Sequence, residues 1–289
     1  TNGMLPLPSN QFAQAANVTI PKGIVTLAIN AASNIVTDSQ STPMFNCMRI
    51  FTTGVNVEFT AIDITDKRTF YMNGLANNNN LQEEIFLEIS KFKKALKLFH
   101  DFNELEVYMD NSMIRIDGTD VVPYPKTGMV TNVSYYARRV SGTFPKGIKA
   151  AFNPPPTEYA EINIKDLEET FARVKAIEDQ TSGGQIGFKI KESTCGINLN
   201  SSYGNVEDEI TLENTVSQSF STVFKYNHLS DIMKVIGEDV MEIGVLPAHP
   251  TNYVIKSKGG KVDMSFTVSG MVGKNGQGSK PKKATSAKP

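Results

Sequence analysis

The sequence has no tryptophan, only two cysteines and only three histidines in 289 residues. Cys47 and Cys195 lie far apart and form no Cys-x-x-Cys pair, and the histidines have none of the spacings that hold a metal ion. We therefore expect no metal or other cofactor. We expect both cysteines to be small buried hydrophobic residues in a reducing compartment.

Long apolar runs and a dominant charge are missing too. No run approaches the roughly 20 apolar residues that a membrane-spanning helix needs, and no signal-peptide pattern precedes the first strand-like segment. We therefore expect a soluble cytoplasmic protein. Because 30 acidic residues balance 29 lysines and arginines, a surface for nucleic acid would require cations gathered on one face.

The sequence contains no enzyme motif. It has no nucleophile elbow, phosphate-binding glycine loop, HExxH helix or metal-binding aspartate cluster, and Asp63 and Asp66 lie on a turn where solvated carboxylates are common. A Gly-x4-Gly-Ser-Lys stretch beginning at Gly273 has the wrong residue order for a phosphate loop. We predict that the protein is not an enzyme.

Composition divides the chain into four parts. Residues 1–16 are polar and contain proline, which predicts a loose arm, and residues 273–289 are basic and poor in apolar groups, which predicts a disordered tail. Hydrophobic residues make up 40% of the chain, enough for a core in each half. Consecutive prolines after Asn153 predict a boundary between domains at 17–153 and 154–272.

The two domains repeat one pattern. Met48 and Val57 match Phe188 and Ile197, both 140 residues later, inside two alternating apolar and polar hairpins. Each hairpin lies between two stretches with apolar residues at helical spacing. These four helical stretches are Lys22–Thr37, Ser90–His100, Lys165–Glu178 and Tyr226–Ile236.

The element order in each half is strand, helix, strands, helix, strands. Such an order predicts an α+β fold with antiparallel sheets and two helices packed on one face of each domain. The chain is therefore expected to contain two tandem copies of one unit.

The order and spacing of several short stretches resemble DNA sliding clamps of the bacterial β-clamp type. The first half resembles the middle domain of that clamp, through Ile20-Pro-Lys, Met44-Phe-Asn-Cys-Met-Arg-Ile, Ala61-Ile-Asp-Ile-Thr-Asp-Lys-Arg and Gly142-Thr-Phe-Pro145. The second half resembles its last domain, through Leu167 to Phe171-Ala-Arg, Ile197-Asn-Leu-Asn-Ser and Phe224-Lys-Tyr226-Asn-His-Leu229. Bacterial clamps have three such domains per chain, and this chain has two.

The resemblance implies a processivity factor and not a catalyst. Such a protein encircles double-stranded DNA without reading its sequence, and raises the effective concentration of a DNA polymerase at the template. Keeping the six-domain ring of the family with two-domain chains implies a homotrimer. The alternatives are that the sequence is a fragment, or that the protein is a processivity factor whose ring does not close. A clamp loader would be a further partner.

The family's helices line the hole of the ring, so their polar faces should carry cations. Helical spacing places lysines opposite the apolar faces of two of the helical stretches. The other two stretches carry further basic residues, and in Lys165–Glu178 these share the helix with Asp166, Glu168 and Glu169. The candidate DNA-facing residues are Lys22, Lys93, Lys94, Lys97, Lys165, Arg173 and Lys234.

The family also has a hydrophobic pocket, between the two domains represented here, that takes short peptides from polymerases and clamp loaders. We transferred the family's pocket positions to the motifs of this sequence that match. The resemblance then implies a pocket formed by the first hairpin, the turn after it, the interdomain segment and the last strand. The candidate residues are Phe45, Thr65, Lys67, Arg68, Pro145, Lys149, Val268 and Met271.

A structural assembly protein, such as a virion or tube subunit built from duplicated β-rich domains, is the alternative. It would account equally well for the repeat and for the missing catalytic motifs. A lysine-bearing face shared by all the helices would favour the clamp, because a shell subunit has no need to gather cations on one side.

Overall fold

The structure of the chain is a computed structural model. It describes residues 16–36, 42–81, 83–122, 132–140, 142–145, 148–177, 184–201, 204–237, 240–259 and 263–270. The predicted arm (apart from Ala16), the predicted basic tail and Met271 lie outside these residues.

The described residues contain the predicted order of strands and helices in both halves. The first half contains β1 (Ala16–Pro21), α1 (Lys22–Ile35), η1 (Pro43–Asn46), β2 (Cys47–Thr53), β3 (Asn56–Asp63), β4 (Arg68–Leu75), β5 (Asn78–Asn79), β6 (Ile85–Glu88), α2 (Ile89–Ala95), η2 (Leu96–Phe99), β7 (Phe102–Met109), β8 (Met113–Val121), β9 (Ser134–Arg138) and η3 (Ile148–Phe152). The second half contains β10 (Ala160–Asn163), α3 (Ile164–Ile177), β11 (Gln185–Lys191), β12 (Thr194–Ser201), β13 (Gly204–Thr211), β14 (Phe220–Lys225), α4 (Tyr226–Ile236), β15 (Val240–Leu246), β16 (His249–Ser257) and β17 (Met264–Ser269). The predicted α+β class is confirmed.

The helices follow from apolar spacing and from their end signals. Helix α1 buries Val25, Ala28, Ala32 and Ile35, which recur every three or four residues and therefore share one face. Helix α4 ends where Gly237 takes a left-handed backbone, with φ of 59°, a conformation that glycine adopts without a Cβ clash. The second predicted helix of the first half becomes a 3₁₀ turn toward its end, as η2 follows α2 directly.

The hairpin register corrects one detail of the predicted repeat. Thr53 pairs with Asn56 in the first hairpin and Lys191 pairs with Thr194 in the second, so the two turns lie 138 residues apart and not 140. A shift of two residues leaves every side chain on the same face of a strand, because strands have a period of two. The apolar pattern therefore cannot detect the shift.

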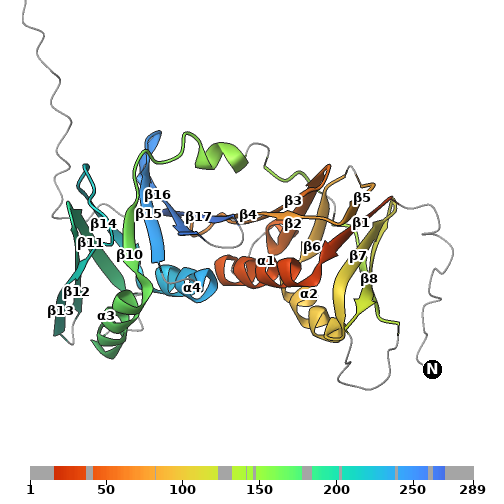
Figure 1. Ribbon diagram of the computed structural model, residues 1–289, viewed down its shortest axis with the longest axis horizontal. Coiled ribbons are helices and arrows are strands. Elements are labelled where there is room, and N and C mark those ends of the chain that lie inside the picture. Colours follow the sequence, from red (N-terminus) through yellow and green to blue (C-terminus); the bar gives the residue numbers. More distant parts are fainter. Residues whose placement is uncertain are drawn as a thin grey trace, which may run out of the picture.

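The strands form three sheets, and the largest belongs to both halves. Its order is β10-β15-β16-β17-β4-β3-β2-β6, flanked by a five-stranded sheet β5-β1-β7-β8-β9 and a four-stranded sheet β13-β12-β11-β14. The halves meet where β17 pairs antiparallel with β4, placing Phe266 opposite Phe70. All four α-helices lie on one side of the molecule, the lower side in Figure 1, with α1 and α4 at the centre and α2 and α3 toward the ends.

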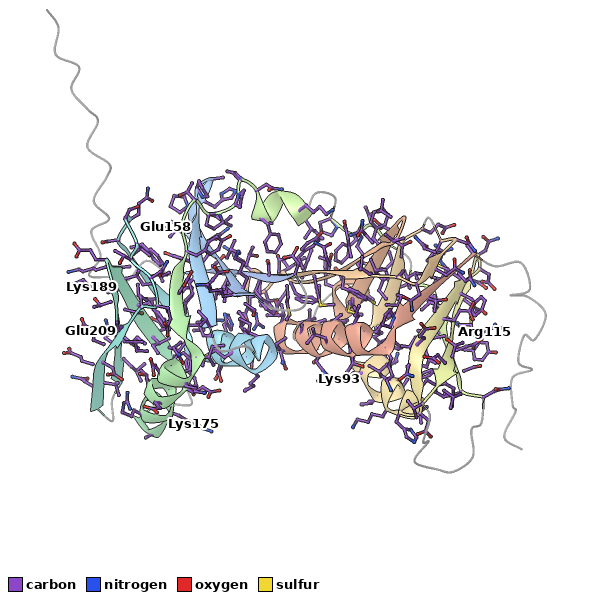
Figure 2. All side chains as sticks on the ribbon, in the orientation of Figure 1. Lys93, Arg115, Glu158, Lys175, Lys189 and Glu209 are labelled. Atoms are coloured by element: carbon purple, nitrogen blue, oxygen red, sulfur yellow. The ribbon has the colours of Figure 1, made fainter. Side chains whose placement is uncertain are left out.

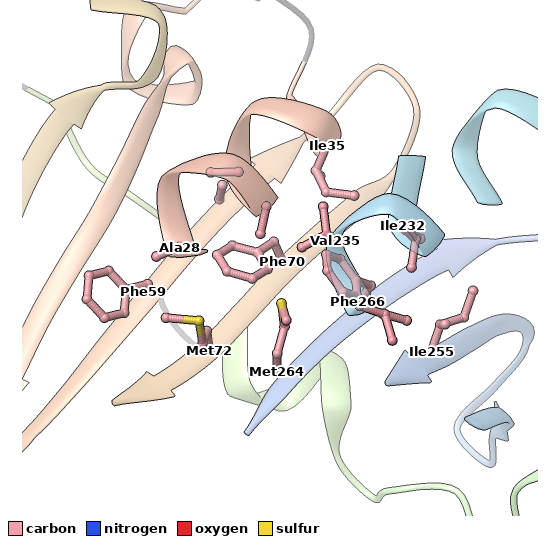
Figure 3. Packing of buried hydrophobic residues seen from close by; sticks show 14 of the residues in the cluster. Ala28, Ile35, Phe59, Phe70, Met72, Ile232, Val235, Ile255, Met264 and Phe266 are labelled. Atoms are coloured by element: carbon pink, nitrogen blue, oxygen red, sulfur yellow. The ribbon is translucent and has the colours of Figure 1, made fainter. Parts of the chain in front are cut away.

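One hydrophobic core runs through the junction between the halves. The rings of Phe70 and Phe266 lie 5.5 Å apart, between centroids, beneath α1 and α4. Ile35 of α1 and Val235 of α4 cover them from the two halves, as Figure 3 shows, and all four side chains are buried. Separating the halves would expose this apolar surface to water, so the two halves form one body.

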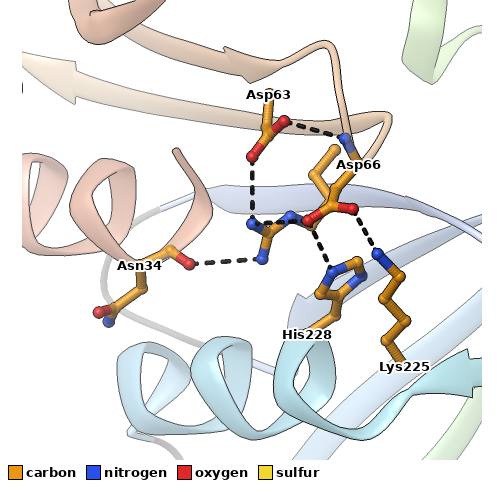
Figure 4. Close-up of polar contacts among 6 residues, drawn as sticks. Asn34, Asp63, Asp66, Lys225 and His228 are labelled. Carbon is orange, nitrogen blue, oxygen red and sulfur yellow. Dashed lines mark hydrogen bonds and ion pairs between the residues drawn. The ribbon is translucent and has the colours of Figure 1, made fainter. Parts of the chain in front are cut away.

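A buried charged network crosses the same junction (Figure 4). The guanidinium of Arg68 on β4 lies 3.2 Å from Asp63 and 3.7 Å from Asp66, and donates to the carbonyl of Asn34 at 3.5 Å. From the other half, Lys225 lies 2.5 Å from Asp66, and His228 of α4 lies 3.2 Å from its second carboxylate oxygen. Asp66 is therefore shared between cations of both halves.

The local environment sets the charges of this network. Burial lowers the pKa of His228 below its ordinary value, and the positive charge of Arg68 acts in the same direction. Burial alone would raise the pKa of Asp66, but the hydrogen bond from Lys225 and the charges of His228, Lys225 and Arg68 outweigh it and lower the pKa. At neutral pH the network thus combines a charged Asp66 with a neutral His228.

Replacing Arg68 with alanine should strongly destabilise the protein. The change leaves the fully buried carboxylate of Asp63 without its guanidinium, and breaking a buried ion pair from one side costs about 3–5 kcal/mol. Urea unfolding would measure this decrease in the free energy of unfolding. Lys234→Ala is the control, because its ion pair with Asp231 is exposed and should contribute less than about 1 kcal/mol; equal decreases in the two variants would contradict the assignment.

Candidate functional site

The helix face is the side of the molecule formed by α1, α2, η2, α3 and α4, and its charge is uneven. Within the described residues, α2 and η2 carry four lysines and no acidic residue. Helix α3 has three basic and three acidic residues, and α1 has a single lysine. In Figure 2, Lys93 and Lys175 lie on the helix side, whereas Glu158 and Glu209 lie over the sheets. Positive charge is therefore concentrated at α2 and η2.

Three of the predicted DNA-facing residues have available charges. Lys94, Lys97 and Lys165 are exposed, and the ammonium group of none of them bonds to another residue in the described part of the chain. Lys94 and Lys97 lie one helical turn apart, so their side chains emerge on one surface. These two lysines can both contact an anion placed against the helix face.

The other four predicted residues bond within the protein. Lys22 donates to the carbonyl oxygens of Phe99 and His100, both at 3.1 Å, and so caps the end of η2. Lys93 donates to Ser33 at 2.7 Å and Lys234 pairs with Asp231 at 3.0 Å, whereas Arg173 pairs with Asp208 and also donates to Thr170 at 3.1 Å. Of these four, Arg173 and Lys234 are still exposed, whereas Lys22 and Lys93 are half-buried.

Sequence reasoning missed another exposed lysine on this face. Lys91 begins the basic series of α2 and pairs with Glu88 at 2.6 Å. Its side chain is 71% exposed, so the pair does not withdraw the lysine from solvent. The series of lysines without an acidic residue, from Lys91 to Lys97, was the signal that could have identified it.

The connector groove lies on the opposite side of the eight-stranded sheet, under the segment that joins the two halves. Figure 1 shows the short helical turn of this segment crossing above the sheet, away from α1 to α4. The groove has a volume of about 490 Å³, which lies within the range of peptide and ligand sites. Its lining residues are Arg49, Phe51, Glu58, Thr60, Tyr71, Glu84, Gly142, Thr143, Phe144, Pro145, Ile148 and Lys149.

Ion pairs and aromatic rings form the walls of the connector groove. Lys149 of the connector pairs with Glu58 on β3, and its hydrogen bond to that carboxylate raises the pKa of the lysine. At the other end, Arg49 pairs with Glu84 at 2.7 Å and lies 4.8 Å from the ring centroid of Phe51. The groove can therefore accept an apolar or aromatic side chain between groups of both charges.

The predicted pocket residues are divided between this groove and the junction. Pro145 and Lys149 line the groove, and the half-buried ring of Phe45 lies 6.4 Å from its wall residue Phe144. Thr65 and Lys67 are exposed on the turn between β3 and β4. Arg68 and Val268 are buried and face the core of the junction, so they offer no surface to a peptide in this conformation.

Most of the groove residues were missed from the sequence, among them Arg49, Glu58, Tyr71 and Glu84. These four residues come from four different segments, and Arg49, Glu58 and Tyr71 are each flanked by core residues. The first three point to the outer face of strands β2, β3 and β4, whose inner face carries the core. The alternation of apolar and polar residues along a strand shows which face of the sheet points away from the core. It does not show which residues of that face a distant segment of the chain will cover.

The described residues also limit the possible chemistry. Burial raises the pKa of Cys47 and Cys195 to about 12, so both remain protonated and are weak nucleophiles. Across the described ranges, no three His, Cys, Asp or Glu residues come close enough to hold a metal ion. None of the described helices has the length and hydropathy required to span a membrane.

Solved structures identify the fold. A DNA polymerase sliding clamp from Bacillus subtilis superposes with a TM-score of 0.79 at 13% identity, covering 94% of this chain and 67% of that one. A DNA polymerase sliding clamp from Pseudomonas aeruginosa superposes with a TM-score of 0.74 at 15% identity, covering 92% of this chain and 70% of that one. The chain has the sliding-clamp fold, as the sequence resemblance predicted.

Sequence comparison adds no further assignment. No protein-family model matches the chain, and no curated protein matches it at a significant level. The likeness therefore concerns the fold, at identities too low to carry residue roles from one protein to the other. The chain spans about two thirds of the length of these clamps.

Proposed function

We propose that this protein is a subunit of a DNA sliding clamp, which encircles double-stranded DNA without sequence preference and holds a DNA polymerase on it. The observation that carries the proposal is the group of exposed lysines on the helix face, the side shared by all four helices. A few phosphate contacts attract DNA independently of its sequence, while a larger number would slow sliding. A tube or shell subunit would have no need for this grouping.

The proposed ring contains three copies. Clamps of the bacterial β-clamp type, which this sequence resembles, close a ring of six domains with three domains in each chain. The present chain spans about two thirds of the length of such a chain. Three chains of two domains supply the same number. Closed rings of identical subunits are the expected outcome when the interface between copies is head-to-tail and the rotation closes.

The connector groove is the proposed site for a polymerase or clamp-loader peptide. It faces away from the helices, so a bound peptide would leave the helix face free for DNA. Its apolar walls and its ion pairs at each end suit a short extended segment with one or two apolar anchors. We assign this role to Pro145 and Lys149, for which the family resemblance implied it, and add Arg49 and Tyr71, which line the same groove.

Retention on circular DNA tests the proposal. The chain is mixed with nicked circular duplex at a concentration too low for copies to assemble, and then concentrated so that rings can close around the DNA. Gel filtration in high salt removes protein held only by charge, because salt screens phosphate contacts. We expect protein to remain on the circle and to be released when one restriction enzyme linearises it.

Linear duplex of the same sequence is the control for this experiment. Protein should leave its open ends, because only topology retains a ring in high salt. Equal release from circular and linear DNA would contradict the clamp function, and so would a strong sequence preference in a binding titration.

Reversing charge on the helix face should weaken the initial electrostatic attraction. In Lys94→Glu/Lys97→Glu we expect lower affinity for linear duplex at low salt. The slope of log affinity against log salt should fall by about 0.9 for each phosphate that the variant no longer neutralises. Lys189→Glu/Lys191→Glu on β11 is the matched control, since both lysines are exposed on a strand and the charge change is identical. Equal effects in the two variants would contradict the assigned DNA-facing surface.

Peptide selection tests the connector groove. Random peptides of about twelve residues, the length of a short linear motif, are displayed on phage and selected on the immobilised wild-type chain, and the enriched peptides are titrated against variants. Pro145→Asp places a charge on the groove wall and should weaken binding at least about tenfold, equivalent to about 1.4 kcal/mol. Val121→Asp, at an exposed hydrophobic position outside the groove, should leave the affinity unchanged. Peptides that bind both variants equally would exclude the groove.

A further inference from the structure

The floor of the connector groove contains a buried hydroxyl group without a partner. Thr60 lies on the outer face of β3 and lines the groove, and its side chain is fully buried. Its hydroxyl oxygen makes no hydrogen bond to any of the described residues. Buried polar groups normally have a partner, because an unmade hydrogen bond destabilises the fold. The hydroxyl of Thr60 therefore remains available to a ligand of the groove.

Arg49 lies directly beside Thr60 on the groove floor. The two residues are opposite each other in the ladder of β2 and β3, and such neighbours have Cβ atoms about 4.5–5.5 Å apart. The guanidinium of Arg49 lies 4.8 Å from the ring centroid of Phe51 and 6.0 Å from that of Phe144. These rings hold the arginine in place, and its side chain is only 16% exposed. A group bound to Arg49 would thus lie within reach of the hydroxyl of Thr60.

The structure already shows a carboxylate bound to Arg49. Glu84 accepts hydrogen bonds from Nε at 3.0 Å and from Nη2 at 2.7 Å, and both end at the same carboxylate oxygen. The remaining amino group of Arg49, Nη1, donates to none of the described residues. The side chain of Glu84 is 43% exposed, and an ion pair this close to solvent contributes little to stability. Glu84 can therefore return to water while Arg49 stays between its rings.

We propose that the connector groove selects peptides with an aspartate or glutamate beside their apolar anchor, and that this acidic side chain displaces Glu84 from Arg49 and accepts a hydrogen bond from Thr60. This inference rests on the peptide site proposed above and defines its specificity. In the free protein Glu84 occupies the place of the peptide carboxylate and competes with it. Arg49 is the specificity-determining residue, and Glu84 is its internal competitor.

The distance between Arg49 and the connector sets the position of the acidic residue. The connector lines the groove with Phe144, Pro145 and Ile148, which form an apolar wall for the anchor. The guanidinium lies 6.0 Å from the ring centroid of Phe144, and successive residues of an extended chain are about 3.3–3.6 Å apart. The acidic residue should therefore lie one or two positions from the apolar anchor.

Glu58 favours a singly charged group at this position. It lies two residues before Thr60 on β3, so both side chains are on the same face of the sheet. Lys149 already pairs with Glu58. A phosphate group carries nearly two negative charges at neutral pH and would be repelled by this carboxylate. A carboxylate carries one charge, and its planar shape matches the arginine fork.

Peptide titration tests the acidic anchor. The probe is the peptide most enriched on the wild-type chain in the display selection described above, among those whose binding Pro145→Asp weakens. Copies of this peptide carry the corresponding amide or a phosphoserine in place of its acidic residue. We expect the acidic peptide to bind at least about tenfold more tightly than the amide copy, because it makes charged hydrogen bonds. The phosphoserine copy should bind less tightly than the acidic peptide.

Removing the internal competitor should strengthen binding. In Glu84→Gln we expect the affinity for the acidic peptide to rise about two- to fivefold, the contribution of a partly exposed ion pair. The affinity for the amide copy should change less. Glu83→Gln is the matched control, because Glu83 is the adjacent residue, loses the same charge and pairs with Arg139 outside the groove. A gain in affinity cannot result from a failure to fold.

Two further variants test the groups that bind the carboxylate. Arg49→Gln should lower the affinity for the acidic peptide at least about tenfold, and the affinity for the amide copy much less. Thr60→Val should lower the affinity for the acidic peptide about two- to tenfold. Because the hydroxyl of Thr60 has no partner in the fold, Thr60→Val should not lower the temperature of thermal unfolding. This second measurement separates a role in binding from a role in folding.

The outcomes separate the acidic anchor from the peptide site. Groove-dependent peptides without a preferred acidic position, or equal effects of Glu84→Gln and Glu83→Gln, would overturn the anchor and leave the groove as the peptide site. Tighter binding of the phosphoserine copy would overturn the choice of a carboxylate. If Pro145→Asp weakened the binding of none of the selected peptides, the peptide site itself would fail, and the acidic anchor with it.

Discussion

The pairing of β4 with β17 is the constraint on which the rest of the structure depends. It joins strands of the two repeats into one eight-stranded sheet. Because Phe70 and Phe266 meet there, α1 and α4 pack side by side over a common core. All four helices consequently lie on one side, and the connector crosses the other side and forms the groove.

Two groups of cations in the described part of the chain have different physical roles. Arg68, Lys22 and Lys225 bond to carboxylates or carbonyls and hold elements of the fold together. Lys94 and Lys97 remain in solvent and carry the charge available to a partner. A buried cation must be paired, because an isolated charge in the protein interior is costly, whereas a solvated lysine needs no partner. Net charge close to zero is therefore compatible with a locally basic face.

Amphipathic helices were predicted well, because their signal is local. Tyr226–Ile236 begins and ends at the predicted residues, and Lys22–Ile35 differs from the prediction only at its end. The predicted alignment of the first hairpin with the second was wrong by two residues. A shift of two residues leaves the alternation of apolar and polar residues along a strand unchanged, so the pattern could not reveal it. Among the proposed site residues, Pro145 and Lys149 lie together in a groove, but Arg68 and Val268 are buried at the junction.

The sequence by itself determined which segments are helices or strands, which faces are apolar, and that the chain repeats one unit. These properties depend on neighbours a few residues away, and spacing records them directly. Only the tertiary structure decided which strand of one half pairs with which strand of the other, which lysines stay unpaired, and where the connector encloses a groove. Those features join residues far apart along the chain, such as Asn73 and Asp263, and a single sequence carries no periodic signal for such distant contacts.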